Sequence, residues 1–150
     1  MGQRVNLRYV DGQLHLPCVI ECKSLRLGRH FTTFVIDTGS TQSLLSDGEV
    51  KALQISLTGK RPDGQIRFGG STYDKVPLPK ITMHLMHETQ QKVKTLQVSL
   101  CALKTHRISE EKRTVAESLP SVLGMDFLET HNLALHVAPK EKVAYLEYDE

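Results

Sequence analysis

FVIDTGST, residues 34–41, is the stretch of this 150-residue chain that says most about its fold. Three residues with high strand propensity lead directly into the carboxylate of Asp37, and the chain then turns at Gly39. An ionisable group at the end of an apolar strand is costly to bury unless a partner satisfies it or a function uses it. From these residues alone, two interpretations are open: a turn in which Asp37 bonds to its own backbone, or a catalytic carboxylate.

The sequence on both sides of this stretch predicts short strands separated by turns. Residues 5–10 alternate between apolar and polar side chains, and Asp11-Gly12 is typical of a two-residue hairpin turn before a return strand at residues 14–22. Pro17 within that return strand indicates an edge position or a bulge. Further strands are predicted at residues 31–36, 76–85, 93–103, 121–124, 133–137 and 143–148.

Short helices are predicted in two places. Ser46 opens a capping box for a helix that ends near Gln54, and residues 125–131 predict one or two helical turns, with Asn132 as a left-handed terminator. Residues 104–118 are charged and polar, which indicates a solvated loop or a frayed helix. Many short strands with one or two short helices predict a single all-β domain over residues 1–150, closed into a barrel.

Composition limits the possible partners and the compartment. The 19 Lys and Arg residues and 17 Asp and Glu residues leave a net charge of +2, which indicates neither a nucleic-acid partner nor an acidic membrane surface. No apolar run is long enough to span a bilayer, and the first ten residues lack the apolar core of a signal peptide. Three cysteines, with Cys18 and Cys22 too loosely spaced to indicate a zinc site, predict reduced thiols in a cytoplasmic protein without a bound metal.

A second motif lies near the other end of the chain: VLGMDFL, residues 122–128. Together with VIDTGS at residues 35–40, it resembles the retropepsin-like aspartic proteases, over roughly residues 14–137. Their hallmarks are two hydrophobic residues before Asp-Thr/Ser-Gly and, later, two hydrophobic residues before a Gly and a helix. The resemblance implies a closed β fold in which the Gly124 segment passes beside the Asp37 loop. Gly39 and Gly124 would then be needed because a Cβ would clash with a nearby backbone.

The resemblance also implies a mechanism. The chain carries one such triplet, and family members with one triplet act as homodimers, so Asp37 would face its counterpart and share one proton with it. The charged carboxylate would activate a water, and the protonated one would polarise the scissile carbonyl, without a metal or another cofactor. Thr38 would bond across the dimer to the opposite loop. Ser40 would donate to the outer oxygen of Asp37, which predicts a working range on the acidic side of neutral.

Such a dimer needs a flap over an extended peptide or protein substrate. The best candidate is the Gly-Gly tip in residues 65–73, formed by Phe68, Gly69, Gly70 and Ser71, because glycine permits both motion and close approach to a peptide backbone. A plain hairpin without this role is the alternative for the same residues. Another possible tip lies at Pro62-Asp63-Gly64.

Three functions remain open at this stage. The first is an endopeptidase of this class, which the intact triplet at Asp37 favours. The second is a catalytically silent retropepsin-like module that binds peptides or dimerises. The third is an unrelated all-β ligand-binding barrel in which both motifs are accidental.

Overall fold

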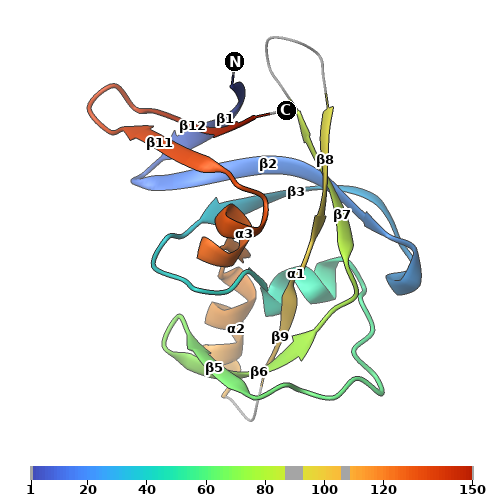
Figure 1. Cartoon of the computed structure of the whole chain (residues 1–150). Coiled ribbons are helices and arrows are strands. Elements are labelled where there is room, and N and C mark those ends of the chain that lie inside the picture. The colour runs from blue at the N-terminus through green and yellow to red at the C-terminus, as the bar shows by residue number, and fades with distance from the viewer. Residues whose placement is uncertain (1, 87–92, 106–108, 150) are drawn as a thin grey trace.

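The computed structural model of the chain describes residues 2–86, 93–105 and 109–149 (Figure 1). These residues form an all-β architecture with a few short helices, as predicted. The strands are β1 Gln3–Val10, β2 Gln13–Cys22, β3 Leu27–Ile36, β4 Leu44–Leu45, β5 Gln65–Phe68, β6 Ser71–Pro77, β7 Ile81–Met86, β8 Val93–Val98, β9 Cys101–Thr105, β10 Val122–Leu123, β11 Ala134–Ala138 and β12 Val143–Tyr148. The helices are η1 Lys23–Leu25, α1 Asp47–Ala52, α2 Glu110–Ser118 and α3 Met125–Thr130.

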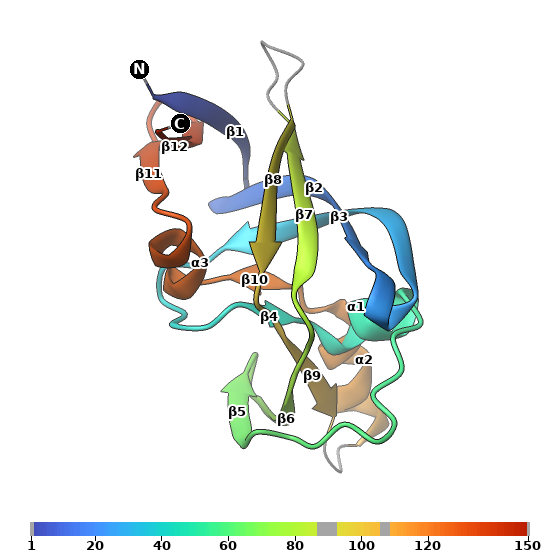
Figure 2. The same ribbon diagram turned by 45° about the vertical axis from the view of Figure 1, so that its right-hand side comes forward.

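Ten of the twelve strands form one continuous path that does not close, so the predicted closed barrel is wrong in this respect; β7 and β8 branch from it, with β7 paired to β2 and to β8. The order is β11-β12-β1-β2-β3-β10-β4-β9-β6-β5, and within the described residues the first and last strands do not pair. Strand β1 joins two parts of the path, because its first half pairs with β12 and its last three residues pair with β2. Figures 1 and 2 show β1, β11, β12 and both termini at one end of the molecule, with hairpin β5–β6 at the opposite end.

The first hairpin has the predicted turn, and Pro17 lies at a locally unpaired edge. Asp11 and Gly12 have φ angles of 48° and 77°, as a two-residue hairpin turn requires. Pairing of β2 with β1 stops at His15, and pairing of β2 with β7 starts only at Val19. Pro17 therefore has a partner strand on one side only, β3, and its missing N–H breaks no hydrogen bond of the sheet.

The two long strands predicted at residues 76–85 and 93–103 are each divided into two. The first becomes β6 and β7, and the second becomes β8 and β9. The division follows Pro77 and Pro79, which cannot donate to a ladder, while Leu78 between them still donates a backbone hydrogen bond to the Leu100 carbonyl at 3.1 Å. The bend lets β7 pair with β2 while β6 pairs with β9. The predicted connection at residues 88–92 lies outside the described residues.

A third α-helix, α2, occupies part of the segment that was expected to be a solvated loop or a frayed helix. The Ser109 side chain caps it by accepting a hydrogen bond from the Lys112 backbone N–H at 3.3 Å, and two glutamates in its first turn suit the helix dipole. Ala116 is its buried residue. The cap predicted at Ser46 is present, because its hydroxyl accepts a hydrogen bond from the Glu49 N–H at the start of α1. None of the helices in the described residues is long and apolar enough to cross a membrane.

Two clusters of buried side chains support the fold. The larger one fills the space between β1, β2, β3, β7, β8 and β12. The smaller one joins β4, β6, β9, β10 and α2, and it consists of Leu44, Tyr73, Leu103, Ala116 and Val122. Ile66 and Phe68 of β5 pack against this smaller cluster. Because Val122 of β10 belongs to it too, hairpin β5–β6 and strand β10 pack on the same core.

All three cysteines have free thiols; Cys18 and Cys22 are buried, and Cys101 is partly buried. Burial, with a smaller contribution from Glu49, raises the pKa of Cys18 to about 12, and burial also raises the pKa of the partly exposed Cys101. At pH 8 we therefore expect a thiol reagent such as dithionitrobenzoate to label the native protein slowly, with Cys101 first. The same reagent should label three thiols at once after denaturation. Rapid labelling of all three in the native protein would contradict the burial described here.

Candidate active site

Strand β10 holds the end of β3 and thereby places Asp37. The two strands are parallel, with Val122 opposite Val35 and Leu123 opposite Ile36. The backbone N–H of Asp37 then donates a hydrogen bond to the carbonyl of Leu123 at 2.9 Å. The two sequence motifs thus lie side by side, and the carboxylate leaves β3 at a point fixed by backbone hydrogen bonds.

The loop after β3 folds back onto the Asp37 carboxylate. The backbone N–H of Gly39 donates to Asp37 Oδ1 at 3.0 Å, and the N–H of Ser40 donates to the Asp37 carbonyl at 3.1 Å. The Asp37 side chain is partly exposed. The turn interpretation and the catalytic one are therefore compatible, because one oxygen orders the turn while the carboxylate still reaches solvent.

The hydroxyl of Ser40 does not contact Asp37, contrary to expectation. It donates instead to the carbonyl of Gln42 at 2.6 Å. A hydroxyl has one proton to donate, so the local turn takes the hydrogen bond that was expected to stabilise the carboxylate.

Gly124 is closely surrounded, whereas Gly39 is not. A Cβ on Gly124 would lie 2.4 Å from the carbonyl oxygen of Ser40 and 2.8 Å from that of Gln42, which matches the predicted close approach. A Cβ on Gly39 would meet only Asp37 Oδ1, at 3.2 Å, and Gly39 does not have a positive φ. Of these two glycines, only Gly124 is crowded by another part of the backbone within one chain.

Two residues that the sequence analysis missed, Ser43 and Asp126, connect the two motifs. The buried Ser43 (2% exposed) donates its N–H to Asp126 Oδ2 at 3.1 Å and its hydroxyl to Asp126 Oδ1 at 2.6 Å. Its Oγ also accepts from the Gly124 N–H at 3.0 Å, and Met125 N–H donates to the Ser40 carbonyl at 2.8 Å. The sequence offered two signals for this pairing: a polar residue just past the first motif, and a carboxylate in the first turn of α3.

Replacing Ser43 by Ala should lower the free energy of unfolding by about 1–2 kcal/mol, because the partly buried Asp126 carboxylate and the buried Gly124 N–H each lose a hydrogen-bond partner. The matched control is Ser118→Ala, which removes an exposed hydroxyl that bonds only within its own helix. Urea unfolding of the two variants checks the difference. Equal stability of the two variants would show that the Ser43 network contributes nothing.

The predicted flap segment is a tight hairpin. Phe68 and Ser71 form its closing pair, and Gly69 and Gly70 form the turn with φ angles of 59° and 84°, values that favour glycine. The tip lies against the Leu119 side chain, since a Cβ on Gly69 would lie 2.4 Å from Leu119 Cδ1. The other candidate tip is not one: Asp63 and Gly64 bond to the backbone of Lys75, at the far end of the same hairpin from the turn.

A cavity of about 280 Å³ lies between the Asp37 loop and β5. Its lining consists of Asp37, Gly39, Ser40, Thr41, Leu44, Ile66, Arg67 and Phe68. Of the predicted flap residues only Phe68 borders it, and Gly124 supports the loop from behind. Thr38 is exposed on the same loop and forms no hydrogen bond with the described part of the chain. Asp37 and Arg67 are the charged residues of the lining.

Comparison with solved structures shows which fold this arrangement belongs to. The crystal structure of a retropepsin-like aspartic protease from Rickettsia conorii superposes with a TM-score of 0.59, covering 99% of this chain and 92% of that chain. The chain has a retropepsin-like fold. Sequence identity to that protein is 14%, so the likeness concerns the fold alone. No protein-family model and no curated protein sequence matches the chain.

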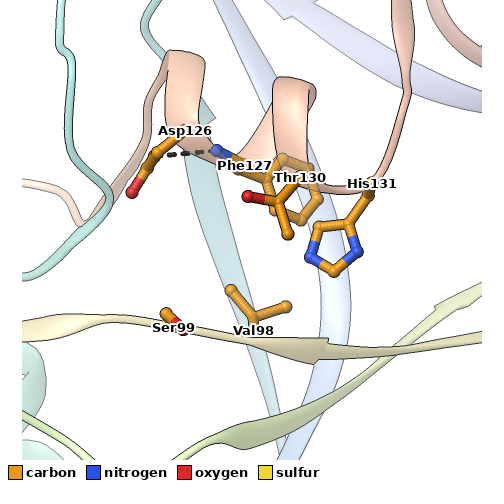
Figure 3. A pocket seen from close by; sticks show the side chains of 6 residues that line it. All are labelled: Val98, Ser99, Asp126, Phe127, Thr130 and His131. Atoms are coloured by element: carbon orange, nitrogen blue, oxygen red, sulfur yellow. Dashed lines mark hydrogen bonds between the residues drawn. The ribbon is translucent and has the colours of Figure 1, made fainter.

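Two further cavities of this retropepsin-like fold lie away from Asp37. One, of about 20 Å³, has room for about one water and lies between α3 and the end of β8 (Figure 3). In Figure 3, Asp126 borders it on one side and His131 on the other, and burial lowers the pKa of His131. The second, of about 420 Å³, lies where Pro17 leaves β2 unpaired, and its lining includes the exposed Phe31 and Met86. In residues 2–86, 93–105 and 109–149, no group of three or more His, Cys, Asp or Glu side chains is placed to hold a metal ion.

Proposed function

We propose that this protein is an aspartic endopeptidase that acts as a homodimer, with Asp37 of each copy facing its counterpart. One observation carries the proposal: the partly exposed Asp37 carboxylate borders a cavity of about 280 Å³ beneath a glycine-tipped hairpin. The retropepsin-like fold supports it. Because the chemistry needs two carboxylates and the chain has one such loop, a second copy would complete the site.

The reaction follows from the shared proton. Two nearby carboxylates do not both ionise readily, so the pair holds one proton. The charged carboxylate takes a proton from water as the water oxygen attacks the scissile carbonyl carbon, and the protonated one donates a hydrogen bond to the carbonyl oxygen. Collapse of the tetrahedral intermediate breaks the C–N bond and delivers a proton to the leaving amine. The Gly39 N–H, which donates to Asp37 Oδ1 at 3.0 Å, orients the carboxylate for this step.

An extended peptide suits the open edge of β5. The Phe68–Ser71 pair closes a two-residue turn, so the next pair, Arg67–Thr72, is of the type without hydrogen bonds between its two residues. The N–H and C=O groups of Arg67 therefore point away from β6 toward the open edge, since β5 is the last strand of the sheet path. A substrate strand would pair with these groups. Across the dimer, the exposed Thr38 hydroxyl would bond to the opposite loop.

A catalytically silent peptide-binding module is the second candidate. Two observations favour it: the Ser40 hydroxyl bonds to Gln42 and not to Asp37, and the hairpin tip rests against Leu119 of the same chain. Such a module would keep the β5 edge and the dimer but would not hydrolyse peptides.

Two measurements on the purified protein separate these functions. Sedimentation velocity measures whether two copies associate, and a mixed peptide library between about pH 4 and 7 reports cleavage by mass spectrometry. Dimers that cleave support the protease. Dimers that bind peptides without cleaving them support the silent module, and a monomer that does neither contradicts both. A cytoplasmic location stays a prediction from the sequence.

A further inference from the structure

We propose that Arg67 makes the proposed site selective for peptides with an acidic residue close to the scissile bond. The inference rests on the proposed function, because it names the substrate class of the same cavity. It starts from the cavity lining, in which Arg67 is the cationic residue and Asp37 the anionic one. The remaining lining residues are neutral: Gly39, Ser40, Thr41, Leu44, Ile66 and Phe68.

The register of β5 places the Arg67 side chain where a substrate side chain would lie. Successive residues of a strand point to opposite faces, and Ile66 and Phe68 pack against the smaller buried cluster. Arg67 therefore projects from the other face, where it is exposed and still borders the cavity. A strand added at the β5 edge would place one of its residues opposite Arg67, with the two side chains on the same face and within reach of each other.

No ion pair within residues 2–86, 93–105 and 109–149 neutralises the charge of Arg67. Two acidic residues face the same region as Arg67. Asp37 lines the same cavity, and Asp74 lies on the same face of the hairpin, where it accepts a hydrogen bond from Gln65. A guanidinium presents paired donors that match a carboxylate, so a substrate Asp or Glu is the natural partner for it.

The test uses pairs of octapeptides that differ only by Glu or Gln at one position, with that position moved along the peptide. At about pH 6, where a substrate Glu is ionised, we expect wild-type protein to prefer the Glu peptide about fivefold in kcat/KM at one position near the cleaved bond. Arg67→Gln should remove this preference, Arg67→Glu should invert it, and Arg67→Lys should retain part of it. Lys140→Gln, in the loop between β11 and β12, removes the same charge at the other end of the molecule and should leave the ratio unchanged.

The pH dependence and a binding measurement make the test independent of turnover. The Glu preference should disappear as pH falls below about 4, because the substrate carboxyl becomes protonated and loses its charge. The same peptides, labelled with fluorescein, can be titrated against the Asp37→Asn variant with and without the Arg67 substitutions. A Glu preference in binding that depends on Arg67 supports this inference even if the wild-type protein cleaves nothing. Unchanged Glu-to-Gln ratios in the Arg67 variants, or no preference in the wild type, would overturn it while leaving the role of Asp37 untouched.

Discussion

Replacing Asp37 by Asn is expected to reduce peptide cleavage at least about 1,000-fold while leaving the fold intact. An amide cannot take the proton of the attacking water, and it cannot share a proton with its counterpart. The structure predicts little cost to stability, because an amide oxygen can still accept the hydrogen bond from Gly39 N–H, and the bond from residue 37 to Leu123 uses the backbone. Cleavage of the peptide library by the two proteins, with thermal unfolding of each, measures both effects.

The matched control is Asp63→Asn, which neutralises an exposed carboxylate outside the cavity and should leave cleavage unchanged. A mixing experiment then tests the dimer. Excess Asp37→Asn protein should lower wild-type activity, because mixed dimers would carry one carboxylate where the reaction needs two. Equal cleavage by wild type and Asp37→Asn would show that Asp37 is not catalytic. Activity that excess variant does not lower would contradict a shared site.

Replacing Gly124 by Ala is expected to lower the free energy of unfolding by about 3 kcal/mol. The new methyl group would lie 2.4 Å from one carbonyl oxygen and 2.8 Å from another, and both oxygens belong to the backbone of the Asp37 loop. Either α3 or this loop would have to move, and Met125 N–H would lose its short hydrogen bond to Ser40. Urea unfolding measures the loss.

Gly28→Ala is the control for this prediction, because it makes the same chemical change where nothing crowds the backbone. No atom lies within 4 Å of a Cβ built on Gly28, and its φ is not positive. Its expected effect is between zero and a gain of about 1 kcal/mol, from the reduced freedom of the unfolded chain. If both variants unfold at the same urea concentration, the two motif loops are not packed as tightly as described.

Those features of the site that depend on neighbouring residues could be predicted from the sequence. The strand before Asp37, the turn at Gly39 and the Asp11-Gly12 hairpin are set by residues within a few positions of each other. The close approach at Gly124 was implied by the family resemblance that the two motifs carry together. Features that depend on distant partners were missed, as in the pairing of Ser43 with Asp126, which lies 83 residues away.

Other differences arise where two local partners compete or where pairing depends on the whole sheet. The Ser40 hydroxyl had two acceptors within reach of its turn, and residue type alone does not decide between Asp37 and Gln42. The open sheet depends on a change of partner within β1, whose last residues pair with β2 as far as His15 and whose first residues pair with β12. The alternation of apolar and polar side chains within β1 carries no information about where this change occurs. Residues 104–118 left a loop and a frayed helix both open, because a cap at Ser109 and one buried alanine in α2 make a weak periodic signal.

The pairing of β1 with β12 determines how the molecule would respond to mechanical force. Gln3 lies opposite Tyr148 at the open ends of two antiparallel strands, so tension on the two termini would act across the ladder and not along it. The hydrogen bonds between the two strands would then break one pair at a time, from Gln3–Tyr148 toward Leu7–Ala144. Strands β2 and β3, which enclose the larger core and support the Asp37 loop, would carry load only after this terminal sheet had peeled away.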